Sequence, residues 1–172
     1  RHTTQSDEHN GGTEMNPLDG KQPITMTVKK SVQFRKGRLI GTGGFGRVYL
    51  GFDQSTGALM AAKEISIGPN AGPNAEDTVL ALQKEVAIMK KLQHENVVRY
   101  FGSERRGSNF YILMEYVPGG TLRNIVDDYG AMEPALAGDF ARQMLQGLRY
   151  IHSRNIVHRD IKAVNVLVGI DG

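Results

Sequence analysis

The chain has 172 residues with 21 Lys plus Arg against 18 Asp plus Glu, a formal net charge of +3 at pH 7. This mild balance excludes the strongly basic pattern of nucleic-acid binders, so we expect no nucleic-acid partner. The absence of cysteine excludes a disulfide framework and a thiolate metal site, and it fits a reducing compartment. No stretch approaches the ~20 apolar residues of a membrane span, so we expect a cytoplasmic protein.

Residues 1–32 are rich in polar residues and glycine and contain few apolar side chains. Such a segment cannot bury enough apolar surface to offset the entropy that it loses on ordering. We therefore predict a polar disordered tail or linker. Residues 33–172, where apolar patterning begins, are predicted to form one domain.

The first ordered unit is predicted from short apolar and β-branched runs that are separated by turn sequences. The sequence DQSTG at positions 53–57 has the composition of a turn, and residues 68–74 that of a loop. The basic stretch 35–38 is interpreted as a solvated strand edge. We expect an antiparallel meander with strands at residues 34–40, 47–52 and 59–67.

A helix is expected next, because apolar residues such as Leu82 and Val86 recur at helical spacing. Asp77 or Thr78 is predicted to cap this helix, and the helix is expected to run to about Leu92. Two further strands are expected at residues 97–101 and 110–117, followed by helices at 121–129 and 134–153. Five strands with one inserted helix, followed by helices, predict an α+β fold with a sheet lobe and a helical lobe.

A glycine cluster follows the first predicted strand, in the sequence Gly41-Thr42-Gly43-Gly44-Phe45-Gly46. Glycine lets backbone N–H groups approach a phosphate closely. Dinucleotide-binding folds space glycines in a similar way, but there the loop opens a helix. Here the apolar run that starts at Val48 reads as a strand, which favours a phosphate-covering loop between two strands. A plain glycine hairpin is the alternative.

Two charged residues are candidates for a site beneath this loop. Lys63 stands fifteen positions after Val48, at the end of the third predicted strand. Glu85 follows inside the predicted helix, from which its carboxylate could pair with the Lys63 ammonium. Taken alone, Glu85 also fits an ordinary surface charge on a helix.

The strongest motif is His158-Arg159-Asp160-Ile161-Lys162-Ala163-Val164-Asn165, with apolar residues on both sides. At every polar position it resembles the catalytic loop of the protein kinases. A polar loop between two buried strands would not require Asp, Lys and Asn at these offsets. The resemblance covers residues 34–168, and it implies a two-lobe fold with a complete N-lobe at about 33–117 and a partial C-lobe at 118–172.

The resemblance implies ATP-dependent phosphorylation of a protein substrate, with Mg²⁺. Asp160 would orient the substrate hydroxyl, Asn165 would bind a magnesium ion, and Lys63, paired with Glu85, would hold the α- and β-phosphates. Lys162 resembles the lysine that contacts the transferring phosphate in Ser/Thr kinases. Arg159 resembles the arginine that receives a phosphorylated activation loop.

A set of nucleotide-binding residues is also implied by the resemblance, in the glycine-rich loop, the third strand, the segment between the lobes and the strand after the catalytic loop. These residues are Ile40, Gly41, Thr42, Gly43, Gly44, Phe45, Gly46, Arg47, Val48, Ala61, Met114, Glu115, Val117 and Leu167. For each apolar member, ordinary core packing is the alternative.

Within the kinases, the sequences EYVPGGTL and GLRYIHSRNIVHRDIKAVNVLV resemble the MAP kinase kinase kinase branch. We therefore expect the protein substrate to be another kinase. The family's Asp-Phe-Gly would fall beyond Gly172, so we expect a piece of a longer product, inactive by itself and poorly folded in its second half. A pseudokinase or scaffold, and a dinucleotide-binding domain, are the competing hypotheses; the second leaves the catalytic loop unexplained.

Overall fold

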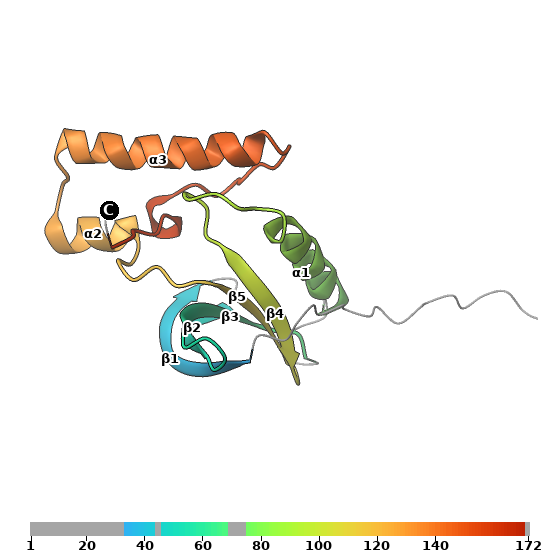
Figure 1. The fold of residues 1–172 in the computed structure, drawn as a ribbon. Helices are drawn as coiled ribbons and strands as arrows, with labels where there is room; N and C mark the ends of the chain where they lie inside the picture. Colours follow the sequence, from blue (N-terminus) through green and yellow to red (C-terminus); the bar gives the residue numbers. More distant parts are fainter. Residues whose placement is uncertain (1–32, 44–45, 69–74, 171–172) are drawn as a thin grey trace, which may run out of the picture.

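The computed structural model describes residues 33–43, 46–68 and 75–170. The predicted tail at residues 1–32 therefore lies outside the described residues, as do Gly44 and Phe45 of the glycine-rich loop. Figure 1 shows a curled sheet with one helix beside it and a separate group of helices above.

A five-stranded antiparallel sheet forms the first part of the molecule, in the order β1-β2-β3-β5-β4. The first three strands form the expected meander, and β5 then pairs with β3 while β4 takes the edge. The strands are β1 (Phe34–Gly43), β2 (Gly46–Asp53), β3 (Leu59–Ser66), β4 (Tyr100–Arg106) and β5 (Asn109–Glu115). The α+β layout predicted from the sequence is confirmed.

The sheet carries a buried apolar cluster on each face, because successive side chains of a strand point to opposite sides. Along β5, Tyr111 and Leu113 pack with Phe34, Met60 and Ala62 on one face. On the other face, β5 contributes Phe110 and Ile112 to a second cluster, which is completed by Ile67, Leu82 and Val86. Burying each large apolar side chain contributes about 1.5–3 kcal/mol. The sheet therefore has its own core on each side.

The helix α1 (Ala75–Met89) supplies Leu82 and Val86 to the second cluster, as their spacing predicts. The predicted ends of this helix were wrong. The helix starts at Ala75, so that Asp77 and Thr78 lie in its first turn and not at its cap. It ends before Leu92 because residues 90–92 form a turn, with Leu92 N–H donating to Met89 O.

The predicted position of the fourth strand was also wrong. We expected residues 97–101, but β4 covers Tyr100–Arg106. Residues 94–97 close a turn through an isolated bridge between His94 and Val97. The polar residues at the end of β4 are strand residues because they pair with β5, and that long-range pairing is not visible in local composition.

The helical part consists of α2 (Leu122–Tyr129), α3 (Pro134–His152) and a short 3₁₀ turn, η1 (Ala163–Asn165). Thr121 caps α2: its hydroxyl accepts from Asn124 N–H, and the Asn124 side chain accepts from Thr121 N–H. In α3 only Gly147 and Ile151 are buried, and α2 buries no residue. None of the helices in the described part of the chain is long and apolar enough to cross a membrane.

The loop after α1 joins the sheet to α3. Gln93 N–H donates to the Tyr150 hydroxyl across 2.6 Å, and the rings of His94 and Tyr150 lie 4.8 Å apart. A Cβ on Gly147 would come within 2.7 Å of the Asn96 carbonyl oxygen, so the helix approaches the loop through a position without a side chain.

Candidate active site

The glycine-rich loop is described in its two arms, residues 40–43 on β1 and 46–48 on β2. These arms pair through Gly41 with Val48 and through Gly43 with Gly46. Gly46 has φ +128°, and a Cβ there would lie 2.2 Å from the Glu64 carbonyl oxygen of β3. This glycine is therefore required by the backbone of β3. Gly43 has no atom within 4 Å of a built Cβ, so its arm is open to a ligand.

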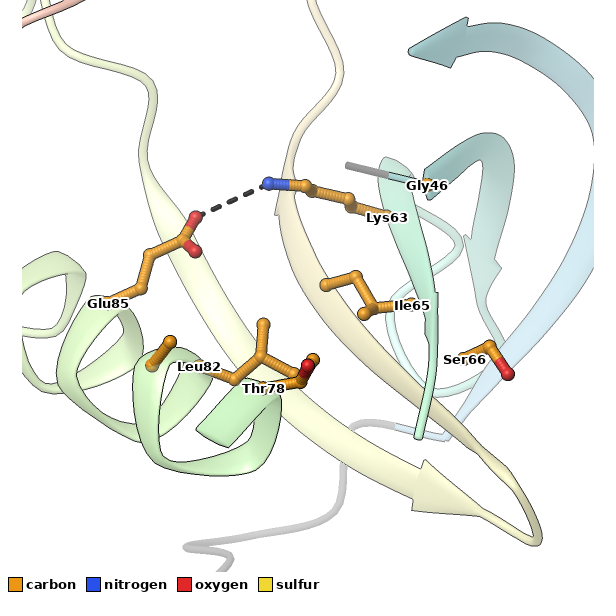
Figure 2. Close-up of a pocket in the computed structure, with 8 residues that line it drawn as sticks. Gly46, Lys63, Ile65, Ser66, Thr78, Leu82 and Glu85 are labelled. Atoms are coloured by element: carbon orange, nitrogen blue, oxygen red, sulfur yellow. Dashed lines mark hydrogen bonds and ion pairs between the residues drawn. The ribbon is translucent and has the colours of Figure 1, made fainter. Parts of the chain in front are cut away.

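Lys63 projects from β3 toward α1, and its ammonium lies 3.3 Å from a carboxylate oxygen of Glu85. This is the contact that the sequence predicts. Figure 2 shows the two side chains reaching toward each other above the apolar wall of the pocket. The pocket has a volume of about 450 Å³, and its lining residues are Gly46, Lys63, Ile65, Ser66, Thr78, Ala81, Leu82 and Glu85.

Sequence reasoning missed the part of this pocket that α1 provides. Thr78 and Leu82 line it together with Glu85. They stand seven and three residues before Glu85 and so lie on the same side of the helix. The spacing to Glu85 was the signal that could have identified them.

The face of the sheet that carries Lys63 also carries most of the predicted adenine-binding residues. Val48 pairs with Lys63, and Met114 pairs with Ala61, two residues before Lys63. Strand alternation therefore places these side chains on one face. Arg47 lies on the opposite face, where a hydrogen bond with Tyr49 raises the pKa of its guanidinium. Only the backbone of Arg47 could contact a nucleotide beneath the loop.

The segment between the two parts begins at the end of β5. The Glu115 N–H donates to the Arg99 carbonyl oxygen across 2.9 Å. A ligand could therefore use the carbonyl of Glu115 and not its N–H. The following turn is tied to the far end of the catalytic loop, because Gly119 N–H donates to Val168 O and Val168 N–H donates to Gly120 O.

In the catalytic loop, Asp160 is held by the two residues that the motif pairs with it. Lys162 Nζ lies 2.8 Å from one carboxylate oxygen of Asp160. The Asn165 amide donates to the other oxygen across 2.8 Å and to the Asp160 carbonyl across 2.9 Å. Arg159, just before Asp160, has φ +66°, a left-handed conformation that non-glycine residues seldom adopt.

These contacts fix both the direction and the charge of the carboxylate. The hydrogen bond from Lys162, followed by the one from Asn165, lowers the pKa of Asp160 below its ordinary value. Asp160 is about half exposed, so the ionised carboxylate can be reached from solvent. The loop therefore presents a negative oxygen pair with a lysine beside it.

A second cavity, of about 630 Å³, lies between the sheet and the helical part. It brings together predicted site residues from both, namely Glu85, Glu115, Val117, Asn165 and Leu167. Glu85 lines both cavities, so the Lys63 pair stands where they meet. The remaining predicted residues Ile40, Thr42 and Ala61 belong to the strands of the sheet that form the glycine-rich loop and its floor.

Comparison with known proteins identifies the family to which this fold and this site belong. The protein kinase domain family matches residues 34–172. A crystal structure of Rad53 residues 1–466 with AMP-PNP superposes with a TM-score of 0.69 at 31% identity, covering 80% of this chain and 35% of that one. The chain therefore belongs to the protein kinase family.

Its relatives include MAP kinase kinase kinases from plants and animals. The chain is 38% identical to YODA of Arabidopsis thaliana over 146 residues, which cover 85% of this chain and 16% of that protein. It is 40% identical to human mitogen-activated protein kinase kinase kinase 3 over 145 residues, which cover 83% of this chain and 23% of the relative. The match thus spans less than a quarter of either relative.

Proposed function

We propose that the chain is the ATP-binding and catalytic-loop part of a Ser/Thr protein kinase that phosphorylates another kinase in a MAP kinase-type cascade. The observation that carries the proposal is the Asp160 cluster, in which an exposed carboxylate is held between Lys162 at 2.8 Å and Asn165 at 2.8 Å. The likeness to MAP kinase kinase kinases at 38% and 40% identity supports the cascade.

Asp160 accepts the hydrogen bond of the substrate hydroxyl and orients it toward the γ-phosphate. An aspartate is ionised at neutral pH even at its ordinary pKa, and the lowered pKa of Asp160 keeps the carboxylate ionised to lower pH, so it can accept that bond. Lys162, held at the same carboxylate, supplies positive charge where charge builds up on the transferring phosphate. Phosphoryl transfer needs this positioning and neutralisation more than it needs covalent chemistry.

Lys63 holds the α- and β-phosphates beneath the glycine-rich loop, and Glu85 keeps its ammonium in place. The adenine lies against Val48, Ala61 and Leu167, and its edge bonds the backbone of Glu115 and Val117. The apolar side chains and the exposed arm at Gly43 support this position of the nucleotide.

Magnesium is the ion that this nucleotide would bring. Mg²⁺ is commonly bound by one or two protein oxygens together with substrate phosphates. Asn165 fits this role, because its amide nitrogen donates to Asp160 and its amide oxygen is of the ligand type that Mg²⁺ takes. Among residues 33–43, 46–68 and 75–170, no group of three or more His, Cys, Asp or Glu is placed to bind a metal by itself. When bound, the ion neutralises phosphate charge.

Nucleotide binding by the 172-residue chain is the first test. We expect titration with Mg²⁺ and ATP to give saturable binding that Lys63→Met weakens, because the substitution removes the cation from the pocket. Arg35→Met, an exposed cation on β1, is the matched control and should leave binding unchanged. Wild-type chain that unfolds cooperatively in both halves and still binds no nucleotide would contradict the proposal.

Phosphoryl transfer is tested separately in the parent protein, because we propose that the 172-residue chain alone is inactive. Transfer to Ser or Thr of a kinase substrate should be lost with Asp160→Asn. A parent protein that binds ATP and its partner but transfers no phosphate would instead be a pseudokinase or scaffold. Partner binding that survives Lys63→Met is expected in both cases, so transfer decides between them.

A further inference from the structure

A buried charged group lies on the face of the sheet opposite the nucleotide pocket. Glu64 follows Lys63 on β3, so its side chain points the other way. It is 9% exposed, although it is a carboxylate. A buried carboxylate is costly unless it is paired and hydrogen-bonded. The stretch 35–38 is exposed on an edge strand, as its composition predicts, and Lys36 within it is also the partner of Glu64.

Glu64 receives hydrogen bonds from two other strands. Lys36 Nζ of β1 donates to it across 2.8 Å, and the hydroxyl of Tyr111 on β5 donates to the same carboxylate oxygen. The Lys36 ammonium also lies 4.2 Å from the ring centre of Tyr49 on β2. One carboxylate thus connects β1, β3 and β5, with the cation resting on β2 between them.

The same residue also contacts the second arm of the glycine-rich loop. Gly46, where that arm begins, lies against the Glu64 carbonyl oxygen, as its lack of room for a Cβ requires. Arg47 at the start of this arm pairs with Glu64 in the β2–β3 register. Glu64 therefore contacts β1 through its side chain, at Lys36, four residues before the first arm, and the second arm through its backbone.

Lys36, Glu64 and Tyr111 form what we call the anchor. The part of β1 between this anchor and the glycine-rich loop is irregular. The pairing of β1 with β2 shifts register between Lys36 and Leu39, and again between Leu39 and Gly41. A second anchor holds only the start of β1, where Arg106 donates to the Phe34 carbonyl oxygen across 2.8 Å and stacks on the Phe34 ring. Regular pairing does not continue from Phe34 to Gly41. We therefore expect the position of the first arm to depend on the anchor at Lys36.

We propose that Lys36, Glu64 and Tyr111 are positioning residues that set the height of the glycine-rich loop above Lys63 from the opposite face of the sheet. The proposal rests on the proposed nucleotide binding. None of the three side chains would touch the nucleotide. Their effect reaches it because the backbone of residue 64 is fixed to both the loop and the pocket lysine beside it.

The test compares Lys36→Met with Arg35→Met in the 172-residue chain. Methionine keeps the length of the Lys36 stem and removes its charge, while Arg35 is an exposed cation on the same strand and serves as the matched control. We expect Lys36→Met to accelerate amide hydrogen exchange at residues 39–43 and 46–48. We also expect it to weaken ATP binding by about threefold to thirtyfold, the range typical of coupling from outside a site. Arg35→Met should change neither measurement.

A charge exchange separates positioning from a general loss of stability. The double variant Lys36→Glu with Glu64→Lys should recover most of the affinity that Lys36→Met loses. Tyr111→Phe removes only the hydroxyl and gives a smaller change of the same sign, so it serves if Lys36→Met does not fold.

The outcomes are distinguishable. If the wild-type chain binds ATP, and Lys36→Met leaves both the affinity and the exchange of the two arms unchanged, the positioning role is wrong and the proposed function stands. If the wild-type chain unfolds cooperatively in both halves and still binds no ATP, the proposed function fails. The exchange of the two arms then still decides the role of the anchor.

Discussion

The sheet and the helical part of this molecule bury their side chains to different extents. In the sheet, Phe110, Ile112 and Leu113 are at most 1% exposed, and α1 covers the face that carries Phe110 and Ile112. In the helical part, α2 buries no residue, while Leu145 on α3 is 65% exposed and Val157 is 62% exposed. The sheet completes its own core, whereas the described helices leave much of their apolar surface in contact with water.

This difference indicates where stability and where chemistry reside. Local unfolding is easiest where few apolar contacts would be lost. The Lys63–Glu85 pair belongs to the well-packed part, and the Asp160 cluster belongs to the sparsely packed part. The expectation that the second half of the 172-residue chain is poorly folded stays a prediction, and the experiments below test the comparison on which it depends.

The largest expected effect comes from opening the core of the sheet. Phe110→Ala should lower the free energy of unfolding by about 3–5 kcal/mol, because it removes a fully buried ring from a cluster shared with α1. Leu145→Ala on α3 should change it by at most about 0.5 kcal/mol, as exposed substitutions usually do. Denaturant titration of both variants measures the contrast, and equal losses would contradict it.

Two glycines of α3 give a matched pair of variants. Gly147 lies at the contact between the sheet and the helical part, and Gly138 lies in open space. Gly147→Ala should destabilise the chain by about 1–3 kcal/mol, because the new Cβ would come within 2.7 Å of the Asn96 carbonyl oxygen. Gly138 has no atom within 4 Å of a built Cβ, so Gly138→Ala should stabilise α3 by about 0.5–1 kcal/mol. Thermal unfolding measures both signs. A stabilising Gly147→Ala would mean that the helix does not press on this loop.

The cap of α2 gives a smaller effect that is confined to the helical part. Thr121→Ala removes the hydroxyl that accepts from Asn124 N–H and should cost about 1 kcal/mol of helix stability. We expect faster amide exchange in α2 with unchanged exchange in β3 and β5. Thr121→Ser keeps the hydroxyl and should behave like the wild type. Spread of the change into the sheet would show that the two parts unfold together.

The smallest expected effect is present near neutral pH and is lost in acid. Burial raises the pKa of Glu64, but hydrogen bonds from Lys36 and Tyr111 outweigh burial and lower the pKa below its ordinary value of 4.5. The folded state therefore gains stability from the ionised form above about that pH, and this gain is lost as the pH falls through the lowered pKa.

The measurement is unfolding by denaturant between pH 6 and pH 2. Glu64→Gln should be less stable than the wild type at pH 6, and the gap should close below about pH 4.5, where the wild-type carboxylate becomes protonated. The pKa of Asp160 is also lowered, but this carboxylate is half exposed, and solvent screening makes Asp160→Asn the weaker perturbation. A gap for Glu64→Gln that stays constant with pH would contradict the assignment.

The parts that the sequence predicted are those with a local signal. The meander follows from alternation and turn residues, and the helix expected at residues 121–129 is α2 at Leu122–Tyr129, with Thr121 as its N-cap. The contact between Lys63 and Glu85 is present as expected. That expectation came from the kinase likeness and not from a local pattern.

The missed features depend on residues far apart in the chain. The polar end of β4 becomes strand only through β5, and Lys36 becomes an anchor only when Glu64 and Tyr111 are folded beneath it. The side of α1 that lines the pocket was missed because its Thr78 resembles a cap. Neither the spacing nor the composition of residues 35–38 indicates that Lys36 lies next to Glu64 in the folded sheet.

The strand order also has a consequence for synthesis. β3 pairs with β2, which directly precedes it in the chain. The other edge of β3 stays unpaired until β5 is made, because β5 follows α1 and β4 in the chain. Closing so long a loop costs entropy before any contact rewards it. A nascent chain that has emerged only through β3 therefore presents a row of unpaired backbone groups beside Lys63, a template for pairing with another chain. The strand that carries the pocket lysine is therefore an open edge of the sheet until β5 has been synthesised and pairs with it.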